Sequence, residues 1–224
     1  MRIYADCLEA VREVERDLYE MGIKVPVQSM QDKVVDGNED YVTKELQSYS
    51  FTVLPPQSRM DDMVEYVFPK SSVLDYCRQE HEDRVSGKIM NPGHSYKVRG
   101  QVWSEFLHKE RFAYTYSQRI TPQLNRIINE LHNKPGTRQA IINIHSNFYH
   151  DVSEVPTLQE IPARDLDRIG GVARIPCSMY YQMMLRDGKL NLIYTMRSCD
   201  FLTHFPVDIW LAIKMQQYVA AAIG

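Results

Sequence analysis

The feature that most constrains this chain is an Asp-Gly pair at positions 187–188, which lies between two apolar, β-prone runs. One run, 183–185, precedes the pair and the other, 190–194, follows it. Asp-Gly favours the primed turns whose twist suits antiparallel strands, so the segment predicts a β-hairpin. Cys177 then lies at the start of one strand, and Arg197 follows the end of its partner.

A second strong signal begins at Pro206, where apolar residues recur on nearly every side of a predicted helix. They are Ile209, Trp210, Ile213, Met215, Tyr218 and Val219. A helix that is apolar all round should be buried. The hairpin and this helix together place five chemically useful side chains at the ends of buried elements, where candidate sites are expected: Cys177, Arg197, Ser198, Asp200 and Asp208.

Apolar residues at three- and four-residue steps predict helices elsewhere in the chain. The predicted helices cover 8–21, which ends at Gly22, then 39–50, 75–88 and 120–131, and a buried strand is expected within 137–144. The segment 23–35 reads as strand and loop. The stretch 151–171 is rich in charge, Pro and Gly, so it is expected to be a surface excursion and not a domain.

Composition excludes several classes of protein. With 224 residues, 44% of them apolar, the chain is long enough for one substantial core, and a single domain over 1–224 is expected. The net charge of -3 gives no reason to expect nucleic-acid binding. No apolar run approaches the ~20 residues that a membrane span needs.

The cysteines and histidines do not suggest a metal site. The four cysteines lack metal-ligand or redox-pair spacing, which suits a reducing cytoplasm. His145 and His150 have no third ligand at a convincing spacing, so two polar histidines near a strand end are expected instead.

The order of short motifs resembles the thymidylate synthase and pyrimidine-nucleotide hydroxymethylase family. The motifs are Pro-Cys at 176–177, Gln182 five residues after the cysteine, Asp-Gly-x-Leu at 187–190, Arg-Ser-x-Asp at 197–200, and Pro-x-Asp-Ile at 206–209. The resemblance covers about 20–224 and is specific from about 120 onward. It implies an α/β fold with one large mixed sheet flanked by helices, packed against a second copy in a homodimer. The family continues beyond this last helix, so its C-terminal segment is expected to be missing here.

The resemblance also implies the roles of individual residues. Cys177 would be the nucleophile, whereas Cys199 falls at a variable position. Taken alone, a single cysteine such as Cys177 could equally be a small buried hydrophobic residue. Arg197 and Ser198 would bind the substrate phosphate, a pairing of forked cation and hydroxyl that suits this group.

Further roles follow from the same resemblance. Asp200 would lie near the base and the folate ring, and Gln182 against the nucleotide. Glu45 would organise water and proton transfers, although a solvated helix charge is the ordinary interpretation of such a glutamate.

Two further residues complete the implied site. Arg138 would reach the phosphate bound by the partner subunit, with Gln139 in place of a second arginine. Tyr96 is a pocket candidate for which core packing is the simpler role.

Asp208 and Ser178 depart from the uridylate-using members, which carry asparagine and histidine at these positions. Asparagine can accept from uracil N3–H and donate to O4. Cytosine reverses this pattern, and an aspartate can accept from its amino group and share a proton with N3. A site built for one hydrogen-bond pattern can reject the other by ~10⁴ or more. Asp208 therefore predicts a cytidylate substrate.

The resulting hypothesis is folate-dependent 5-hydroxymethylation of dCMP or CMP. Addition of Cys177 to C6 would make C5 nucleophilic toward the methylene carbon of 5,10-methylenetetrahydrofolate. Attack by water on the resulting exocyclic methylene would yield the hydroxymethyl product, whereas hydride transfer would yield 5-methyl. Methylation of dCMP or dUMP, and a non-catalytic nucleotide-binding relative, remain the alternatives.

Overall fold

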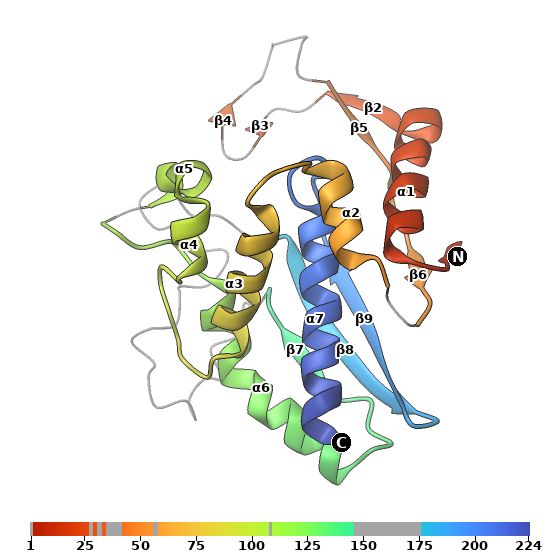
Figure 1. Cartoon of the computed structure of the whole chain (residues 1–224), viewed down its shortest axis with the longest axis vertical. Coiled ribbons are helices and arrows are strands. Elements are labelled where there is room, and N and C mark those ends of the chain that lie inside the picture. The colour runs from red at the N-terminus through yellow and green to blue at the C-terminus, as the bar shows by residue number, and fades with distance from the viewer. Residues whose placement is uncertain are drawn as a thin grey trace. The chain divides into compact units, whose positions relative to one another are not determined.

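The computed structural model describes residues 2–26, 29–30, 33–34, 42–55, 58–107, 109–145 and 176–224. The chain divides into two compact units, Met1–Ser71 and Ser72–Gly224 (Figure 1). The predicted excursion at 151–171 and the histidine at position 150 lie outside the described residues. Cys177 and the residues around it belong to the second unit.

Helix α1 (Cys7–Met21) and helix α2 (Met60–Val67) pack together in the first unit. The carboxylate of Asp6 caps α1 by accepting from the amide of Glu9 at 2.8 Å. The helix ends at Met21, with Gly22 as its C-cap. Because the buried residues of α1 recur at helical spacing along one face, the predicted amphipathic helix is confirmed.

The strands of the first unit form three two-stranded sheets. β1 (Arg2–Tyr4) pairs in parallel with β6 (Phe51–Val53), whereas the other two pairs are antiparallel: β2 (Ile23–Pro26) with β5 (Val42–Glu45), and β3 (Ser29–Met30) with β4 (Lys33–Val34). The strand expected within 23–35 is confirmed by β2.

The helix predicted over 39–50 is wrong. Val42–Glu45 is strand β5, with Glu45 opposite Ile23, and a turn follows at 47–48. Val42 and Thr43 are β-branched residues that favour a strand, and cross-strand pairing outweighs the weak helical spacing of the apolar positions. Glu45 therefore lies on a strand and not on a helix.

The second unit contains a three-stranded antiparallel sheet and a set of helices. The strands are β7 (Ile141–Asn143), β8 (Ser178–Arg186) and β9 (Lys189–Met196), in that order across the sheet. The helices are α3 (Val73–Val85), α4 (Ser95–Val98), α5 (Gly100–Trp103), α6 (Tyr116–Asn133) and α7 (Phe205–Ile223), with a 3₁₀ turn η1 (Ser104–Phe106). The helices predicted near 75–88 and 120–131, the helix after Pro206 and the hairpin are all confirmed.

The hairpin turn has the geometry that its sequence predicts. Asp187 has a φ of 52° and Gly188 a φ of 69°, so both central residues are in the left-handed region that a type I′ turn requires. The resulting register places Ser178 opposite Met196 at the far end of the hairpin. Residues just before β8 and just after β9 are therefore neighbours, which brings Cys177 to Arg197.

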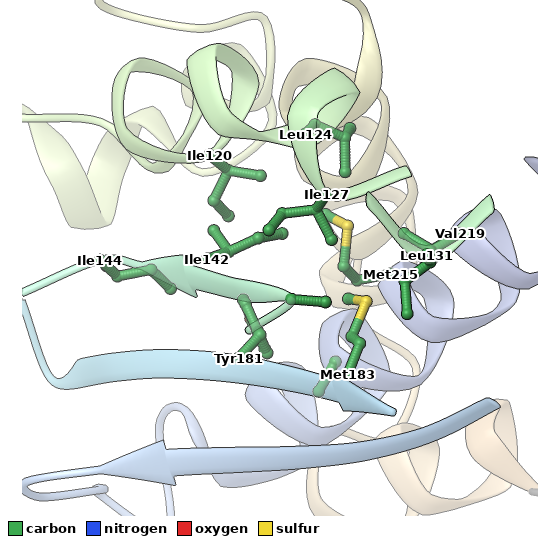
Figure 2. Close-up of a cluster of buried hydrophobic side chains, with 12 residues drawn as sticks. Ile120, Leu124, Ile127, Leu131, Ile142, Ile144, Tyr181, Met183, Met215 and Val219 are labelled. Atoms are coloured by element: carbon green, nitrogen blue, oxygen red, sulfur yellow. The ribbon is translucent and has the colours of Figure 1, made fainter. Parts of the chain in front are cut away.

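One face of this sheet is covered by α6 and α7 (Figure 2). The core between them is made of apolar side chains from four elements or their ends: Ile120, Leu124, Ile127, Leu131, Ala140, Ile142, Ile144, Tyr181, Met183, Ala212, Met215 and Val219. Tyr181 and Met183 alternate with Gln182 along β8, so Gln182 points to the other face of the sheet.

The predicted α/β class is confirmed. The described residues form small sheets of two and three strands where one large mixed sheet was expected. No helix in the described part of the chain is long and apolar enough to cross a membrane.

Candidate active site

The thiol of Cys177 lies between a guanidinium and a hydroxyl. Ser198 Oγ donates toward Cys177 Sγ at 3.6 Å, and Arg197 Nη2 lies 4.0 Å from the same sulfur. The Arg197 amide donates to the Cys177 carbonyl at 2.9 Å, and its Nε donates to the carbonyl of Pro176, also at 2.9 Å. The backbone at the open end of the hairpin thus fixes the cation beside the sulfur.

Asp200 organises the turn that leads into α7. Its Oδ1 accepts from the amides of Leu202 and Thr203 at 3.0 and 3.2 Å, and its carbonyl accepts from the amides of His204 and Phe205. The side chain itself is exposed. A carboxylate held in this way has a defined position next to Ser198 and Cys199.

Asp208 lies in the first turn of α7 and is partly buried. The Cys199 thiol donates to its Oδ2 at 3.7 Å. Burial raises the pKa of the Asp208 carboxyl to about 7, although Arg84 and the Cys199 thiol favour the charged form; Glu80 adds to the rise. Asp208 can therefore exchange a proton near neutral pH.

The hydroxyl of Ser178 is held by two tyrosines. Ser178 is buried, and its Oγ lies 2.5 Å from Tyr194 Oη and donates to Tyr116 Oη at 3.3 Å. Burial is the main cause that raises the pKa of both tyrosines, so their hydroxyls remain protonated. The residue after Cys177, expected at the base edge, is thus part of a hydroxyl cluster.

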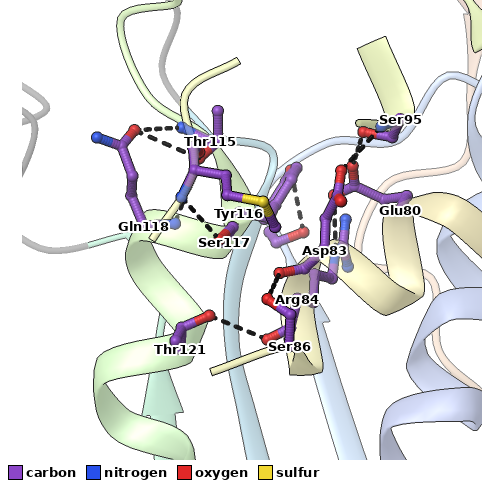
Figure 3. Close-up of polar contacts among 12 residues, drawn as sticks. Glu80, Asp83, Arg84, Ser86, Ser95, Thr115, Tyr116, Ser117, Gln118 and Thr121 are labelled. Carbon is purple, nitrogen blue, oxygen red and sulfur yellow. Dashed lines mark hydrogen bonds and ion pairs between the residues drawn. The ribbon is translucent and has the colours of Figure 1, made fainter. Parts of the chain in front are cut away.

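Behind this cluster lies the ion pair of Arg84 and Glu80 (Figure 3). Arg84 Nε donates to Glu80 Oε1 at 2.8 Å, and Arg84 Nη1 donates to Tyr181 Oη at 3.3 Å. Glu80 Oε2 accepts from Ser95 Oγ at 2.7 Å. Tyr181 stacks on Tyr194 with ring centroids 4.6 Å apart, so the ion pair connects to the residue that follows Cys177.

Gln182 and Arg138 meet each other and not Cys177. Gln182 Nε2 donates to the Arg138 carbonyl at 3.0 Å. Five residues of extended chain separate Gln182 from Cys177, which corresponds to about 16 Å. Arg138 is exposed and lines a shallow cleft of about 460 Å³ between the end of α6 and β7, with Glu130, Lys134, Gly136, Thr137 and Gln139.

Two other predicted site residues are placed elsewhere. Tyr96 lies on α4 and packs edge-on against Phe112, with ring centroids 5.5 Å apart, which fits a packing role. Glu45 belongs to the first unit, and Thr43 Oγ1 donates to it at 3.4 Å. Among the described residues, no group of three or more His, Cys, Asp or Glu side chains is arranged to hold a metal ion.

Sequence inspection missed four residues of this region: Glu80, Arg84, Tyr116 and Tyr194. The only local signal was at Tyr116, where Thr115 and Gln118 form a capping box that marks the start of α6. The contacts of Arg84 join residues up to 97 positions apart, and no local pattern encodes such a distance.

The family model described as thymidylate synthase matches residues 80–224, which include the hairpin, α7 and all the groups around Cys177. The chain belongs to the thymidylate synthase family. The match begins at Glu80, within α3, and therefore also includes the Glu80–Arg84 pair.

Individual relatives agree with this assignment. The chain is 29% identical over 119 residues to a "Putative thymidylate synthase" of Methanosarcina barkeri, covering 50% of this chain and 46% of that protein. A protein of the same description from Methanocaldococcus jannaschii is 26% identical over 123 residues, with 55% and 49% covered. The chain thus spans about half the length of the curated relatives it matches.

Solved structures of the family were also found. Thermostable thymidylate synthase A from Bacillus subtilis has a TM-score of 0.49 at 17% identity, covering 66% of this chain and 51% of that one. Thymidylate synthase from T4 phage has a TM-score of 0.46 at 20% identity, with 65% and 51% covered.

Proposed function

We propose that this thymidylate synthase family member transfers a one-carbon unit to C5 of a pyrimidine nucleoside monophosphate, and that its substrate is a cytidylate, dCMP or CMP, converted to the 5-hydroxymethyl product. The observation that carries the proposal is the joint placement of Cys177, Arg197 and Ser198 at the open end of the hairpin, close in sequence to Asp208.

The environment of Cys177 supports nucleophilic addition. A thiolate is the reactive form of cysteine, and a guanidinium 4.0 Å from the sulfur favours the negative charge. Addition to C6 of the pyrimidine breaks the delocalisation of the ring and makes C5 a carbon nucleophile. Arg197 and Ser198 also provide a forked cation and a hydroxyl for the substrate phosphate, as the family resemblance implies.

The state of Asp208 supports cytosine recognition. Cytosine offers an amino donor and, at N3, an acceptor, so a carboxyl group that pairs with both must carry a proton. Because the pKa of Asp208 is raised to about 7, mainly by burial, this proton is available near neutral pH. An asparagine in its place would fit uracil, whose N3–H donates and whose O4 accepts.

The family implies 5,10-methylenetetrahydrofolate as the one-carbon donor, and Asp200 fits such a group. Its exposed carboxylate, held in place by two backbone amides, offers an acceptor to the N–H groups of a folate ring. The folate would supply the methylene carbon that becomes bonded to C5. Loss of the C5 proton and departure of tetrahydrofolate would leave an exocyclic methylene on the base. Water attack on this methylene, with release of the Cys177 thiolate from C6, would give the hydroxymethyl product.

A carboxylate should organise removal of the C5 proton, and two residues are candidates. The sequence resemblance proposes Glu45. Glu80 is favoured by its environment, because it is buried in the second unit, its carboxylate accepts from Arg84 and Ser95, and it contributes to the raised pKa of Asp208.

Glu80→Gln and Glu45→Gln decide between these carboxylates. We expect Glu80→Gln to lower C5 proton release by at least ~100-fold, the range of general acid–base catalysis, and Glu45→Gln to have a much smaller effect. Circular dichroism of both variants would control for folding. The reverse order of losses would assign the role to Glu45.

The proposed reaction is tested by release of tritium from C5-labelled dCMP, CMP and dUMP in the presence of methylenetetrahydrofolate, with Cys177→Ala as the control. Cysteine-dependent release from a cytidylate, with hydroxymethylcytidylate found by product analysis, is the expected result. Release from dUMP alone would refute the substrate assignment. Nucleotide binding without release from any substrate would identify a non-catalytic relative.

A further inference from the structure

Ser95, the first residue of α4, joins two buried carboxylates of helix α3. Its amide donates to Asp83 Oδ2 at 2.8 Å, and its hydroxyl donates to Glu80 Oε2 at 2.7 Å (Figure 3). The three residues are between 2% and 8% exposed. Because Glu80 and Asp83 are three positions apart on a helix, their side chains lie on the same face. Ser95 therefore holds α4 on that face of α3.

Both oxygens of the Glu80 carboxylate accept from a buried donor. Arg84 Nε donates to Oε1 at 2.8 Å, and the Ser95 hydroxyl donates to Oε2. Arg84 is one turn further along the same helix, whereas Ser95 comes from a separate element. Two donors on two different oxygens fix the plane of the carboxylate. Since a carboxylate offers about four acceptor sites, each oxygen can still accept from a water molecule.

The backbone that leads into Ser95 is built around Asp83. Asp83 Oδ1 lies 3.1 Å from His94 Nδ1, so this carboxylate contacts two successive residues. The chain approaches it closely at Gly93, where an added Cβ would meet Asp83 Oδ2 at 2.3 Å. A side chain at that position would displace the carboxylate. The position of the Ser95 hydroxyl is thus set by Asp83 and by the absence of a side chain at Gly93.

Two further side chains connect Glu80 to the residue that follows Cys177. The guanidinium carbon of Arg84, which is bonded to Glu80, lies 4.2 Å from the centroid of the Tyr116 ring. The hydroxyl of Tyr116 accepts from Ser178 Oγ at 3.3 Å. The carboxylate that Ser95 holds therefore belongs to the network around the candidate nucleophile.

We propose that Ser95 is a positioning residue for removal of the C5 proton: held by Asp83 through its amide, it donates to Glu80 Oε2 and so orients the carboxylate that takes the proton through water. In this step the C5–H bond breaks, and its electron pair forms the double bond of the exocyclic methylene. The bond to tetrahydrofolate breaks at the same time, and its electron pair leaves on the nitrogen. The inference rests on the proposed function, since it takes Glu80 as the base, but it does not depend on which pyrimidine is bound.

A purely structural role for Ser95 would tie α4 to α3 without affecting Glu80, and a double-variant cycle separates the two roles. C5 tritium release at saturating nucleotide is measured for the wild type, Ser95→Ala, Glu80→Gln and the double variant. The substrate is C5-labelled dCMP, or labelled CMP or dUMP if the wild type releases tritium only from one of those. The dissociation constant of the same nucleotide is measured in parallel.

We expect Ser95→Ala to lower tritium release by about tenfold, because the carboxylate is still present but is no longer held in one orientation. Nucleotide affinity should stay close to that of the wild type. The double variant should be no slower than Glu80→Gln alone, because without a carboxylate the Ser95 hydroxyl has no base to orient. A structural loss would instead multiply with the loss caused by Glu80→Gln.

Ser117→Ala is the matched control for removal of a buried hydroxyl. Ser117 is 2% exposed, and its Oγ donates to the Lys88 carbonyl at 2.8 Å and accepts from the Met90 amide at 3.2 Å. This variant should lose stability much as Ser95→Ala does, yet keep tritium release near the wild-type rate. Urea unfolding of both variants measures the stability.

Gly93→Ala tests the same hold without changing a polar side chain. By displacing Asp83 it should loosen Ser95 and lower tritium release several-fold, again with no further loss in a Glu80→Gln background. Unchanged release in folded Ser95→Ala and Gly93→Ala, or losses that multiply with that of Glu80→Gln, would overturn the proposal.

Failure of the proposed function would look different from failure of the role of Ser95. A wild type that releases no tritium from any of the three nucleotides would overturn the proposed function itself. An active wild type whose Glu80→Gln variant keeps full activity would retain the proposed reaction, remove Glu80 as the base and so overturn the role of Ser95.

Discussion

At the scale of single residues, the chemistry of this protein depends on which groups surround one thiol and one carboxyl. Cys177 has a cation and a hydroxyl beside its sulfur, and Asp208 has burial and one cation acting in opposite directions on its proton. Neither residue is unusual by type. Their neighbours, contributed by the ends of β8, β9 and α3, make them candidates for a nucleophile and a base reader.

Arg197→Met should slow alkylation of Cys177 by iodoacetamide at pH 7 by up to about tenfold, because the cation that favours the thiolate is removed. Labelling is measured by mass spectrometry of the Cys177 peptide in a Cys199→Ala background, since Cys199 is exposed and Cys177 is partly exposed. Arg186→Met, at the turn end of the same hairpin, is the control and should leave the rate unchanged. Equal rates in all three proteins would contradict a role for Arg197 at the thiol.

Asp208→Asn should change how stability depends on pH. The folded-state pKa of Asp208 is raised from 3.8 to about 7, so the folded protein binds the proton more tightly than the unfolded chain. This stabilisation is present below pH ~4 and is lost as the pH rises through 7, a total of roughly 2–4 kcal/mol in the free energy of unfolding. Asparagine does not titrate and avoids this loss.

Urea unfolding of the two proteins at pH 5 and pH 8 measures this effect. The variant should gain stability relative to the wild type between the two pH values, and it should bind dUMP better than dCMP. A stability difference that is the same at both pH values would show that Asp208 does not titrate in this range.

At the scale of elements, the hairpin and α7 could be predicted because residues close in sequence specify them. The Asp-Gly turn requires the left-handed backbone at 187 and 188, and the apolar residues of α7 repeat within a few turns. The strand that carries Glu45 could not be predicted in this way. Its conformation depends on pairing with β2, about twenty residues earlier, and cross-strand contacts are absent from a local pattern.

The candidate site shows the same division. The motifs around Cys177 could be found because each is a short run of residues. The network from Arg84 through Tyr181 and Tyr194 to Ser178 joins α3 to the two strands of the hairpin, and Arg84 and Tyr181 are 97 positions apart in the chain. It became visible only when the fold brought these elements together.

The hairpin turn permits a direct test at this scale. Gly188 has a φ of 69°, and a side chain there is strained even though nothing lies within 4 Å of an added Cβ. Gly188→Ala should therefore lower the free energy of unfolding by about 1 kcal/mol. Gly136→Ala is the matched control, because that glycine also has open space around it and its φ is not in the left-handed region.

Chemical denaturation of both glycine variants checks this prediction. Gly136→Ala should lie within ~0.5 kcal/mol of the wild type. Because the turn sets the register that places Cys177 beside Arg197, Gly188→Ala should also slow Cys177 alkylation. Equal stability losses in the two variants would show that the left-handed turn is not what costs energy.

At the scale of the whole molecule, the sheet of the second unit has two faces. Helices α6 and α7 cover one face, and the side chains that alternate with the core residues lie on the opposite face. Gln182 and Ile193 are opposite each other in the register and alternate with core residues, so they share the second face. Ile193 is 45% exposed there. An apolar side chain on a sheet face beside Arg138 is consistent with the homodimer that the family resemblance implies.

The dimer proposal makes a sharp prediction if Arg138 acts on the phosphate bound by the partner subunit. Cys177→Ala and Arg138→Ala should each abolish or strongly reduce C5 tritium release when assayed alone. Mixed and allowed to exchange subunits, the two proteins form some heterodimers in which one site has both an intact Cys177 and an intact Arg138 from the other subunit. Activity should therefore reappear on mixing, to about a quarter of the wild-type value at equal amounts with free exchange, because half of the dimers are mixed and each has one complete site out of two.

If Arg138 served its own subunit, every site in the mixture would lack one residue, and activity would stay at the level of the separate variants. Sedimentation of the mixture shows whether dimers are present. If a dimeric mixture recovers no activity, Arg138 does not act at the site of the partner subunit.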